Sequence, residues 1–290
     1  MAIIAAAIKI GPAMLVPLAR RARSVLRRLV PLNLRSEIHY RLVANRLTRR
    51  IYDNLTELDI IGIELHDGSG KPWSTFKTDA PTGSMSERVV EIPWVLSRYG
   101  GQRRVLDIGP AYALPLYLRH LRMLRIPQLH GVDLTAKPVK GLVMDRADVR
   151  QMPYPDTSFD LIFCISTLEH IGCDNARYDI EAPTDPLGDA RALAEMRRVL
   201  ADDGRILITV PFGRRQDYGW FRQYDRERWS DLINKVGLAA AEQAYYGYSP
   251  SGWALVDEPS ALERLGYQEI GAPAATAVLC ASLRTRGSLT

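Results

Sequence analysis

The 290-residue sequence predicts an α/β protein of the doubly wound kind, in which a mostly parallel sheet has helices on both faces. Two observations support this prediction. From residue 86 onward, short apolar runs bounded by turn residues alternate with segments of helical spacing. In RRVLDIGPAYALPLYLRHL (Arg103–Leu121), an apolar run turns at a single glycine and then becomes helical, as a strand does before its crossover helix.

The expected elements follow in order. A helix begins at Ser86 and ends at the glycines 100 and 101. Short apolar runs predict strands at Arg104–Ile108, Gln128–Val132, Leu161–Ile165, Arg205–Val210, Ala239–Tyr246 and Ala275–Leu283. Two more helices are expected at Leu187–Leu200 and Asp225–Val236, with Asp225 as the N-cap of the second.

The sequence divides into three regions. Residues 1–52 form a basic and apolar helical arm, residues 53–85 form a connector rich in Gly, Ser, Pro and Asp, and residues 86–290 form the main domain. The arm holds eleven Lys/Arg and one acid, Glu37, so its local charge is +10. The rest of the chain has 27 basic and 32 acidic residues, a charge of −5, which argues against a nucleic-acid channel.

The arm has three possible roles. Lys9, Pro12 and Pro17 interrupt its apolar part, which argues against a membrane-spanning helix. An apolar face beside Arg20, Arg21, Arg23, Arg27 and Arg28 suits peripheral contact with an anionic membrane surface. The alternatives are packing on the body or on a second subunit of an oligomer. Three scattered cysteines favour reduced thiols, so a cytoplasmic location is expected.

The loop after the first strand restricts the choice of cofactor. A dinucleotide loop needs several glycines and free N–H groups for a pyrophosphate, but here only Gly109 remains, and Pro110 has no N–H. A nucleoside without phosphates needs only a tight turn, small side chains such as Ala111 and a nearby acid. Asp133 ends the next strand, where a carboxylate can accept both ribose hydroxyls. Asp148 can accept from an adenine amino group, with Val149 against the ring.

Four segments between about Val105 and Gly213 resemble the class I S-adenosylmethionine-dependent methyltransferases of the type 11 group. They are VLDIGPAYA, GVDLT, ADVRQMPYPDTSFDLIFCISTLEHIG and EMRRVLADDGRILITVPFG, which have the family's order and spacing. The resemblance implies a Rossmann-like sheet of seven strands and S-adenosylmethionine as cofactor. It also implies the cofactor-binding residues Asp107, Gly109, Pro110, Ala111, Asp133, Leu134, Asp148, Val149 and Ser166.

Glu169 and His170 are the predicted catalytic residues. They follow the fourth expected strand, and a histidine near neutral pKa is a natural base for removing a hydroxyl proton. Similar Glu-His pairs in the family line the active site, and some relatives bind a divalent metal there. One such pair does not define a metal site, so the metal question stays open, and His170 could instead cap or pack a helix.

The segment after the fifth strand predicts the acceptor wall. Phe212, Tyr218, Trp220 and Tyr224 alternate with charged residues, and a carbohydrate needs flat apolar faces together with hydrogen-bonding groups. The alternative is an aromatic lid packed over the cofactor. Glu87, Glu91 and Trp94 could also reach the pocket, although a core-packed or solvated helix explains them more simply.

These observations predict an S-adenosylmethionine-dependent methyltransferase that methylates a sugar hydroxyl of a glycolipid, polysaccharide or glycosylated natural product. A quinone or other lipid-like acceptor is one alternative, because the basic arm would serve it equally. A non-catalytic nucleoside-binding scaffold is another, because the loop has lost glycines. A nicotinamide oxidoreductase is disfavoured by Pro110 and by the missing glycines.

Overall fold

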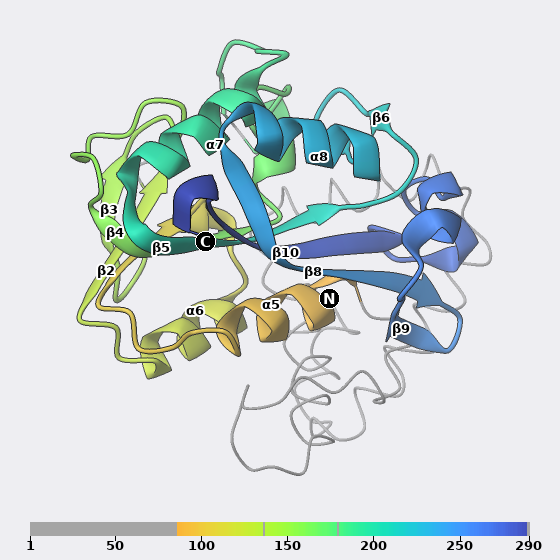
Figure 1. The fold of residues 1–290 in the computed structure, drawn as a ribbon, viewed down its shortest axis with the longest axis horizontal. Coiled ribbons are helices and arrows are strands. Elements are labelled where there is room, and N and C mark those ends of the chain that lie inside the picture. The colour runs from red at the N-terminus through yellow and green to blue at the C-terminus, as the bar shows by residue number, and fades with distance from the viewer. Residues whose placement is uncertain (1–85, 136, 179, 289–290) are drawn as a thin grey trace, which may run out of the picture.

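The computed structural model describes residues 86–135, 137–178 and 180–288. The predicted arm (1–52) and connector (53–85) lie outside the described residues. In the described part, an eight-stranded sheet has the order β3-β2-β1-β4-β5-β10-β8-β9, and a separate ribbon pairs β6 with β7 (Figure 1). The strands are β1 Arg104–Ile108, β2 Gln128–Asp133, β3 Val143–Arg146, β4 Phe159–Ile165, β5 Leu200–Pro211, β6 Gln216–Asp217, β7 Arg222–Gln223, β8 Leu238–Ser249, β9 Gly252–Leu255 and β10 Ala277–Thr285.

Strands β1 to β5 pair in parallel, whereas β10 pairs antiparallel with both β5 and β8. The predicted fold class is therefore confirmed, and the strand number differs by one from the prediction. The additional strand is β9, which turns back from β8 and pairs Ser249 with Gly252 at the sheet edge. Its four residues, GWAL, are half exposed and give too short an apolar run to indicate a strand.

Within the described ranges, four α-helices cover the two faces of the sheet (Figure 1). Helices α5 (Arg88–Leu96) and α6 (Pro115–Met123) lie on one face, and α7 (Gly188–Val199) and α8 (Arg226–Lys235) lie on the other. Asp225 is the predicted N-cap of α8, and its side chain accepts a hydrogen bond from the Arg228 N–H at 2.7 Å. Short 3₁₀ turns occur at η1 Pro110–Tyr112, η2 Leu168–His170, η3 Ala176–Tyr178, η4 Pro259–Arg264, η5 Glu269–Gly271 and η6 Arg286–Ser288.

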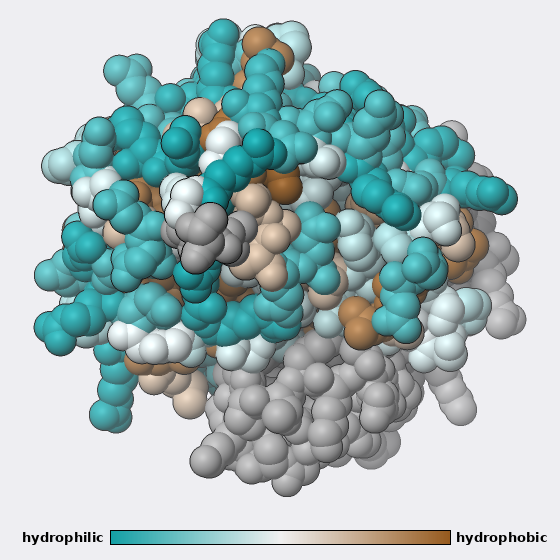
Figure 2. Space-filling view, viewed as in Figure 1, coloured by the Kyte–Doolittle hydropathy of each residue, from teal (hydrophilic) through white to brown (hydrophobic). Residues whose placement is uncertain are grey.

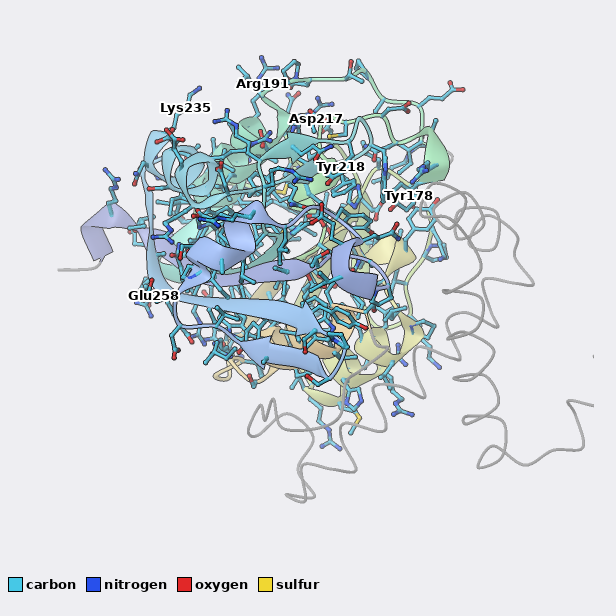
Figure 3. The ribbon with its side chains drawn as sticks, turned by 90° about the vertical axis from the view of Figure 1, so that its right-hand side faces the viewer. Tyr178, Arg191, Asp217, Tyr218, Lys235 and Glu258 are labelled. Atoms are coloured by element: carbon cyan, nitrogen blue, oxygen red, sulfur yellow. The ribbon has the colours of Figure 1, made fainter. Side chains whose placement is uncertain are left out.

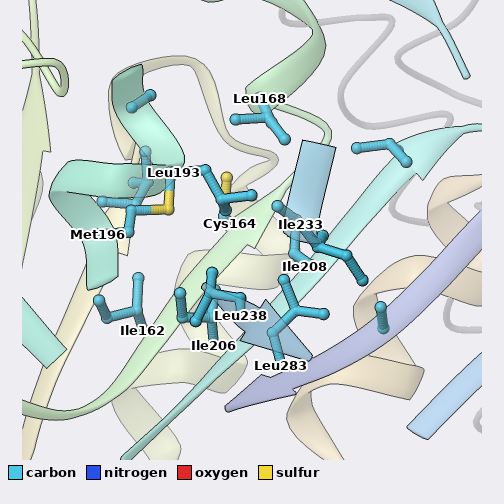
Figure 4. Close-up of a cluster of buried hydrophobic side chains, with 14 of the residues drawn as sticks. Ile162, Cys164, Leu168, Leu193, Met196, Ile206, Ile208, Ile233, Leu238 and Leu283 are labelled. Atoms are coloured by element: carbon cyan, nitrogen blue, oxygen red, sulfur yellow. The ribbon is translucent and has the colours of Figure 1, made fainter. Parts of the chain in front are cut away.

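Each face of the sheet has its own hydrophobic core. On the α7 and α8 face, Leu193, Met196 and Ile233 pack on β4, β5 and the start of β8 (Figure 4). On the other face, Trp94 of α5 and Leu121 of α6 are fully buried in the second cluster. Burial of this apolar surface at about 25 cal/mol per Å² holds the helices against the sheet and so fixes the strand ends that carry the site.

The outer surface is largely hydrophilic on the face that Figure 2 shows, where apolar residues form small, separate patches. Such isolated apolar residues are ordinary for a folded domain. Among the described residues, no helix is both long and apolar enough to cross a membrane.

Candidate active site

A cavity of about 320 Å³ opens at the carboxyl ends of the central strands. In a doubly wound sheet this edge is where ligands bind, and the volume lies at the lower end of the usual range for small-molecule sites. One half is lined by Asp107, Gly109, Asp133 and Asp148, from the ends of β1, β2 and β3. The other half is lined by residues of α5, of the turn after β4 and of the segments beside β5 and β10.

The loop between β1 and α6 has few free N–H groups. The N–H of Gly109 donates to Val132 O at 2.9 Å, that of Ala111 donates to the Asp133 carboxylate at 3.1 Å, and that of Ala113 donates to Pro110 O at 3.1 Å. Pro110 has no N–H to offer. The loop is therefore unsuited to a pyrophosphate, as the sequence predicts, and it remains compatible with a nucleoside that has no phosphate.

Gly109 makes the tight turn possible. Its φ is +73°, and a Cβ at this position would lie 2.7 Å from Thr167 Cγ2 on the turn after β4. A side chain is disfavoured there both by the left-handed backbone and by the neighbouring chain. The absence of a side chain brings the ends of β1 and β4 together at the floor of the cavity.

Asp133 is fixed in place by backbone groups. One carboxylate oxygen accepts from Ala111 N–H at 3.1 Å and the other from Thr135 N–H at 3.0 Å. Each oxygen keeps a free lone pair, and the side chain lines the cavity, so it can still accept from a pair of hydroxyls. This arrangement suits the predicted ribose contact.

Asp148 also lines the cavity, but Arg150 holds its carboxylate. The Nε of Arg150 donates to both carboxylate oxygens at 3.0 Å, and its Nη2 donates to Oδ2 at 2.6 Å. Hydrogen bonds from Arg150 hold the pKa of Asp148 below its usual value, although partial burial opposes them. Val149 and Leu134 line the same half of the cavity.

Asp107 places a buried carboxyl group at the cavity. Its Oδ2 makes no hydrogen bond among the described residues. Burial raises the pKa of the carboxyl group to about 8, and the neighbouring Tyr117 hydroxyl acts against this rise. An orphaned carboxyl oxygen at a cavity wall is costly unless a ligand supplies a donor. The α-ammonium group of an amino-acid ligand would supply this donor, so the residues present fit S-adenosylmethionine.

Ser166 connects the cavity to α5. Its backbone has φ +41°, its N–H donates to Thr209 O, and its hydroxyl donates to Glu91 Oε1 at 2.6 Å. Glu91 is completely buried and accepts a second hydrogen bond from Arg88 Nη1 at 2.6 Å. The predicted cofactor residue Ser166 therefore lines the cavity with its hydroxyl already committed to α5.

The predicted catalytic pair reaches the other half of the cavity. His170 Nδ1 lies 2.9 Å from Trp220 O, so this nitrogen carries the proton and Nε2 is the free acceptor. Burial lowers the pKa of His170 to about 4, and it raises the pKa of Glu169 well above its usual value. His170 Nε2 lies 3.9 Å from Glu169 Oε1, and burial favours the neutral form of both groups, which disfavours an ion pair.

Of the four aromatic residues predicted for the acceptor wall, only Trp220 lines the cavity. It stacks on His170 with ring centroids 5.3 Å apart, and the Arg177 guanidinium lies 4.4 Å from its ring centroid. Its neighbour Phe221, which was not among the four, also lines the cavity. The segment thus contributes a wall, but with fewer aromatic residues than the prediction requires.

The other three aromatic side chains need a correction. Phe212 is buried against Tyr245 in the core, and the fully buried Tyr224 donates its hydroxyl to Asp189 at 3.1 Å. Tyr218 stacks on Phe221 with ring centroids 4.5 Å apart, and its hydroxyl accepts from Tyr267 N–H at 3.0 Å. None of the three lines the cavity, because β7 and its flanking turns direct them into the core or onto Phe221.

Several cavity residues were not predicted from the sequence. Arg88 reaches the cavity from the start of α5, Tyr178 from the segment after β4, and Tyr267 from the segment before β10. Glu87 also lines the cavity, although a core-packed or solvated helix was the simpler interpretation of its sequence. Glu91 and Trp94, also on α5, are buried and do not line the cavity. Within the described ranges, no group of three or more His, Cys, Asp or Glu side chains could hold a metal ion.

Comparison with known proteins identifies the domain. Residues 106–208 match the profile of a family described as a methyltransferase domain. A curated protein of Encephalitozoon cuniculi (strain GB-M1), which carries a provisional methyltransferase name, is 28% identical over 139 residues. The match covers 40% of this chain and 60% of that protein, so it spans less than two thirds of the relative's length.

Solved structures with a similar fold share little sequence with this chain. The YcgJ protein of Bacillus subtilis is 18% identical, with a TM-score of 0.44, covering 68% of this chain and 99% of that chain. The 1,6-didemethyltoxoflavin-N1-methyltransferase of Burkholderia thailandensis, bound to 1,6-didemethyltoxoflavin and S-adenosylhomocysteine, is 13% identical with a TM-score of 0.42. That match covers 66% of this chain and 75% of the other.

The fold defines the described part as a doubly wound α/β domain with a cavity at the carboxyl ends of its central strands. The family match then makes the assignment specific: residues 106–208 are a methyltransferase domain similar to the class I, type 11 S-adenosylmethionine-dependent methyltransferases. Similarity to this family implies S-adenosylmethionine as the cofactor.

Proposed function

We propose that the protein methylates a sugar hydroxyl of a glycolipid, polysaccharide or glycosylated natural product, with S-adenosylmethionine as methyl donor. One observation supports the choice of acceptor: aromatic rings and hydrogen-bonding groups line the same half of the cavity. Tyr178, Trp220 and Tyr267 provide the rings. Carbohydrate sites combine apolar ring faces with groups that bind the hydroxyls.

The cofactor half positions the donor through three carboxylates. Asp133 would bind the ribose hydroxyls, Asp148 the adenine amino group, and Asp107 the ammonium of the methionine part. When bound, S-adenosylmethionine supplies a methyl group on a positively charged sulfur. The protein holds the acceptor close to this methyl group and in line with it, which can provide much of the rate enhancement.

The polar side chains of the acceptor half would bind and orient the sugar. Glu87 and Glu169 can bind hydroxyls, and Arg88 keeps donors beyond the one used for Glu91. His170, as a neutral imidazole with a free Nε2, can accept one more hydrogen bond. The Trp220 ring stacks on His170 and also contacts the Arg177 guanidinium, and both contacts fix that wall of the cavity.

The test is a transfer assay with tritium-labelled S-adenosylmethionine. We would incubate the full-length protein with methyl glycosides of neutral, amino and acidic hexoses, with lipid-linked glycans and with hydroxylated quinols, and identify products by mass spectrometry. Methylated glycosides would support the proposal. Methylated quinols with unmodified glycosides would contradict it and favour the lipid-like acceptor.

Calorimetric titration separates an enzyme from a binding scaffold. We expect S-adenosylmethionine and S-adenosylhomocysteine to bind in the micromolar range, with no detectable binding of NAD, because the loop lacks free N–H groups for a pyrophosphate. If neither nucleoside binds, the loss of glycines has abolished cofactor binding, and the scaffold function replaces the enzymatic one.

A further inference from the structure

Glu87 belongs to the acceptor half of the cavity. It directly precedes α5, and its side chain lines the cavity although the residue is only 8% exposed. Its Oε2 accepts from Ala275 N–H, 3.2 Å away on the segment that leads into β10. Its own backbone N–H is a second hydrogen-bonding neighbour of the carboxyl group. Backbone groups thus hold this carboxyl group at the cavity wall, where a hydroxyl group of the acceptor can still reach it.

The two predicted catalytic residues are poorly suited to remove a proton. His170 donates from Nδ1 to Trp220 O, and burial lowers its pKa to about 4, which makes it a weak base near neutral pH. Glu169 is 2% exposed, its Oε2 has no partner among the described residues, and burial raises its pKa well above the usual value. Burial therefore favours the protonated form of Glu169, and a protonated carboxyl group cannot accept another proton.

We propose that Glu87 is the catalytic base that takes the proton of the acceptor hydroxyl, an inference that rests on the proposed function. The acceptor oxygen forms a bond to the methyl carbon, while the carbon–sulfur bond breaks and its electron pair stays on sulfur. The hydroxyl proton passes to Glu87 Oε1. The step converts one carboxylate and one sulfonium into a neutral acid and a neutral thioether, so charge and atoms balance.

The charged neighbours of Glu87 adjust its basicity. Burial raises the pKa of Glu87 to about 7, the charge of Arg88 acts against this rise, and Glu91 adds to it. Glu169, on the turn after β4, faces the same group from the other side. Arg88 Nη1 is held by Glu91, and the Arg88 side chain is 30% exposed, so the guanidinium is fixed near the mouth of the cavity. A base with a pKa close to working pH is the most effective one.

The first test does not depend on an acceptor. We would label the full-length protein with ¹³C in the glutamate carboxyl groups, saturate it with S-adenosylhomocysteine and follow the carboxyl resonances against pH. The Glu87 signal is the one missing from E87Q. We expect it to titrate with a midpoint near 7. A midpoint below 5.5 would overturn the inference, because the carboxylate would then be a weak base.

The second test uses an acceptor that the transfer assay identifies. We expect E87Q to lower kcat about 100-fold or more, the usual contribution of a general base, and to leave the Kd for S-adenosylhomocysteine within twofold. In the wild type, log kcat should rise with pH up to about 7 and then level off. This rise should vanish in E87Q, a result that a purely structural role would not produce.

The matched control is E258Q, because Glu258 is exposed and lies far from Tyr178 of the cavity (Figure 3). Its kcat and pH profile should equal those of the wild type. An E87Q variant that keeps kcat within threefold would overturn the inference while leaving the sugar proposal intact. If Glu87 titrates near 7 and no glycoside is methylated, the proposed sugar acceptor fails, and the titration still supports Glu87 as a base.

Discussion

Asp133 is fixed before any nucleoside binds, because both its oxygens already accept backbone N–H groups. We expect Asp133→Ala to weaken binding of S-adenosylhomocysteine by about 100-fold or more, since two hydrogen bonds to a charged group are worth roughly 1.5–3 kcal/mol each. Calorimetry would measure this loss. Asp231→Ala, at an exposed position on α8, should leave the affinity unchanged. Equal affinities in the two variants would exclude Asp133 as the ribose ligand.

Asp107 should make the stability of the cofactor-free protein depend on pH. Burial raises its pKa to about 8, from an ordinary value near 3.8, so the native state holds a proton that the unfolded chain has already released. The free energy of unfolding should therefore fall as pH rises from 7 to 8. His120 and His170 do not oppose this trend, because burial lowers the pKa of each to about 4 and both are neutral from pH 7 to 8.

The change between pH 7 and 8 should be on the order of 1 kcal/mol, because one proton corresponds to 1.36 kcal/mol per pH unit. Thermal unfolding of the wild type and of Asp107→Asn would measure it. The variant should lose the part of the decline that is due to Asp107, and the parts due to Glu87 and Glu169, whose pKa values are also raised by burial, should remain. The same decline in both proteins would mean that Asp107 is already ionised in the native state.

At the scale of elements, the connection between β1 and α6 depends on Gly109. We expect Gly109→Ala to lower the free energy of unfolding more than Gly101→Ala does. Both glycines have positive φ, but a Cβ at Gly101 meets no atom within 4 Å, whereas one at Gly109 meets Thr167 Cγ2 at 2.7 Å. The left-handed backbone costs each variant roughly 1–2 kcal/mol, and crowding adds about 1–3 kcal/mol at Gly109.

Chemical denaturation would compare the two alanine variants. The added substitution Thr167→Ser removes the nearest crowding atom, so it should recover part of the loss in Gly109→Ala and none in Gly101→Ala. Equal destabilisation of both glycine variants would show that the turn after β4 moves aside without cost.

The elements that the sequence predicts well are those whose burial makes them apolar throughout. The predicted and observed β1 coincide, and β4 and β5 each contain the predicted range, because central parallel strands are covered on both faces. Strand β3, VMDR, was not assigned from sequence, because it lies at the sheet edge and none of its residues is buried. Edge strands of mixed polarity show no regular alternation of apolar and polar residues from which a strand could be predicted.

The two halves of the cavity also differ in how well the sequence predicts their residues. Asp107, Gly109 and Asp133 could be predicted because each lies at or next to the carboxyl end of a strand. In a parallel sheet, these ends lie at the same edge, where ligands bind. Glu87 depends on the packing of α5 against β4 and β10, which its local sequence does not encode. The aromatic segment shows the same limit: spacing alone could not indicate that Trp220 reaches the cavity while Tyr224 enters the core.

At the scale of the whole molecule, the sequence separates a basic arm from an acidic body, with charges of +10 and −5. A body of this sign is repelled by an anionic membrane, so only the arm could bring the cavity to a lipid-linked acceptor. We propose that residues 1–52 bind such a surface through Arg20, Arg21, Arg23, Arg27 and Arg28. Each basic residue near the surface contributes about 1 kcal/mol, so five of them together give an attraction of roughly 5 kcal/mol.

Co-sedimentation with vesicles tests this proposal. The full-length protein should sediment with phosphatidylglycerol vesicles at low salt and stay in solution with phosphatidylcholine, and about 0.5 M salt should release it because screening shortens the range of the attraction. Replacing the five arginines by glutamine should abolish binding and leave the affinity for S-adenosylhomocysteine unchanged. Equal binding to both kinds of vesicle would assign the contact to the apolar residues. Absence of binding, with a dimer in sedimentation velocity, would instead place the arm between two subunits, and a lipid-linked acceptor would then have to reach the cavity without it.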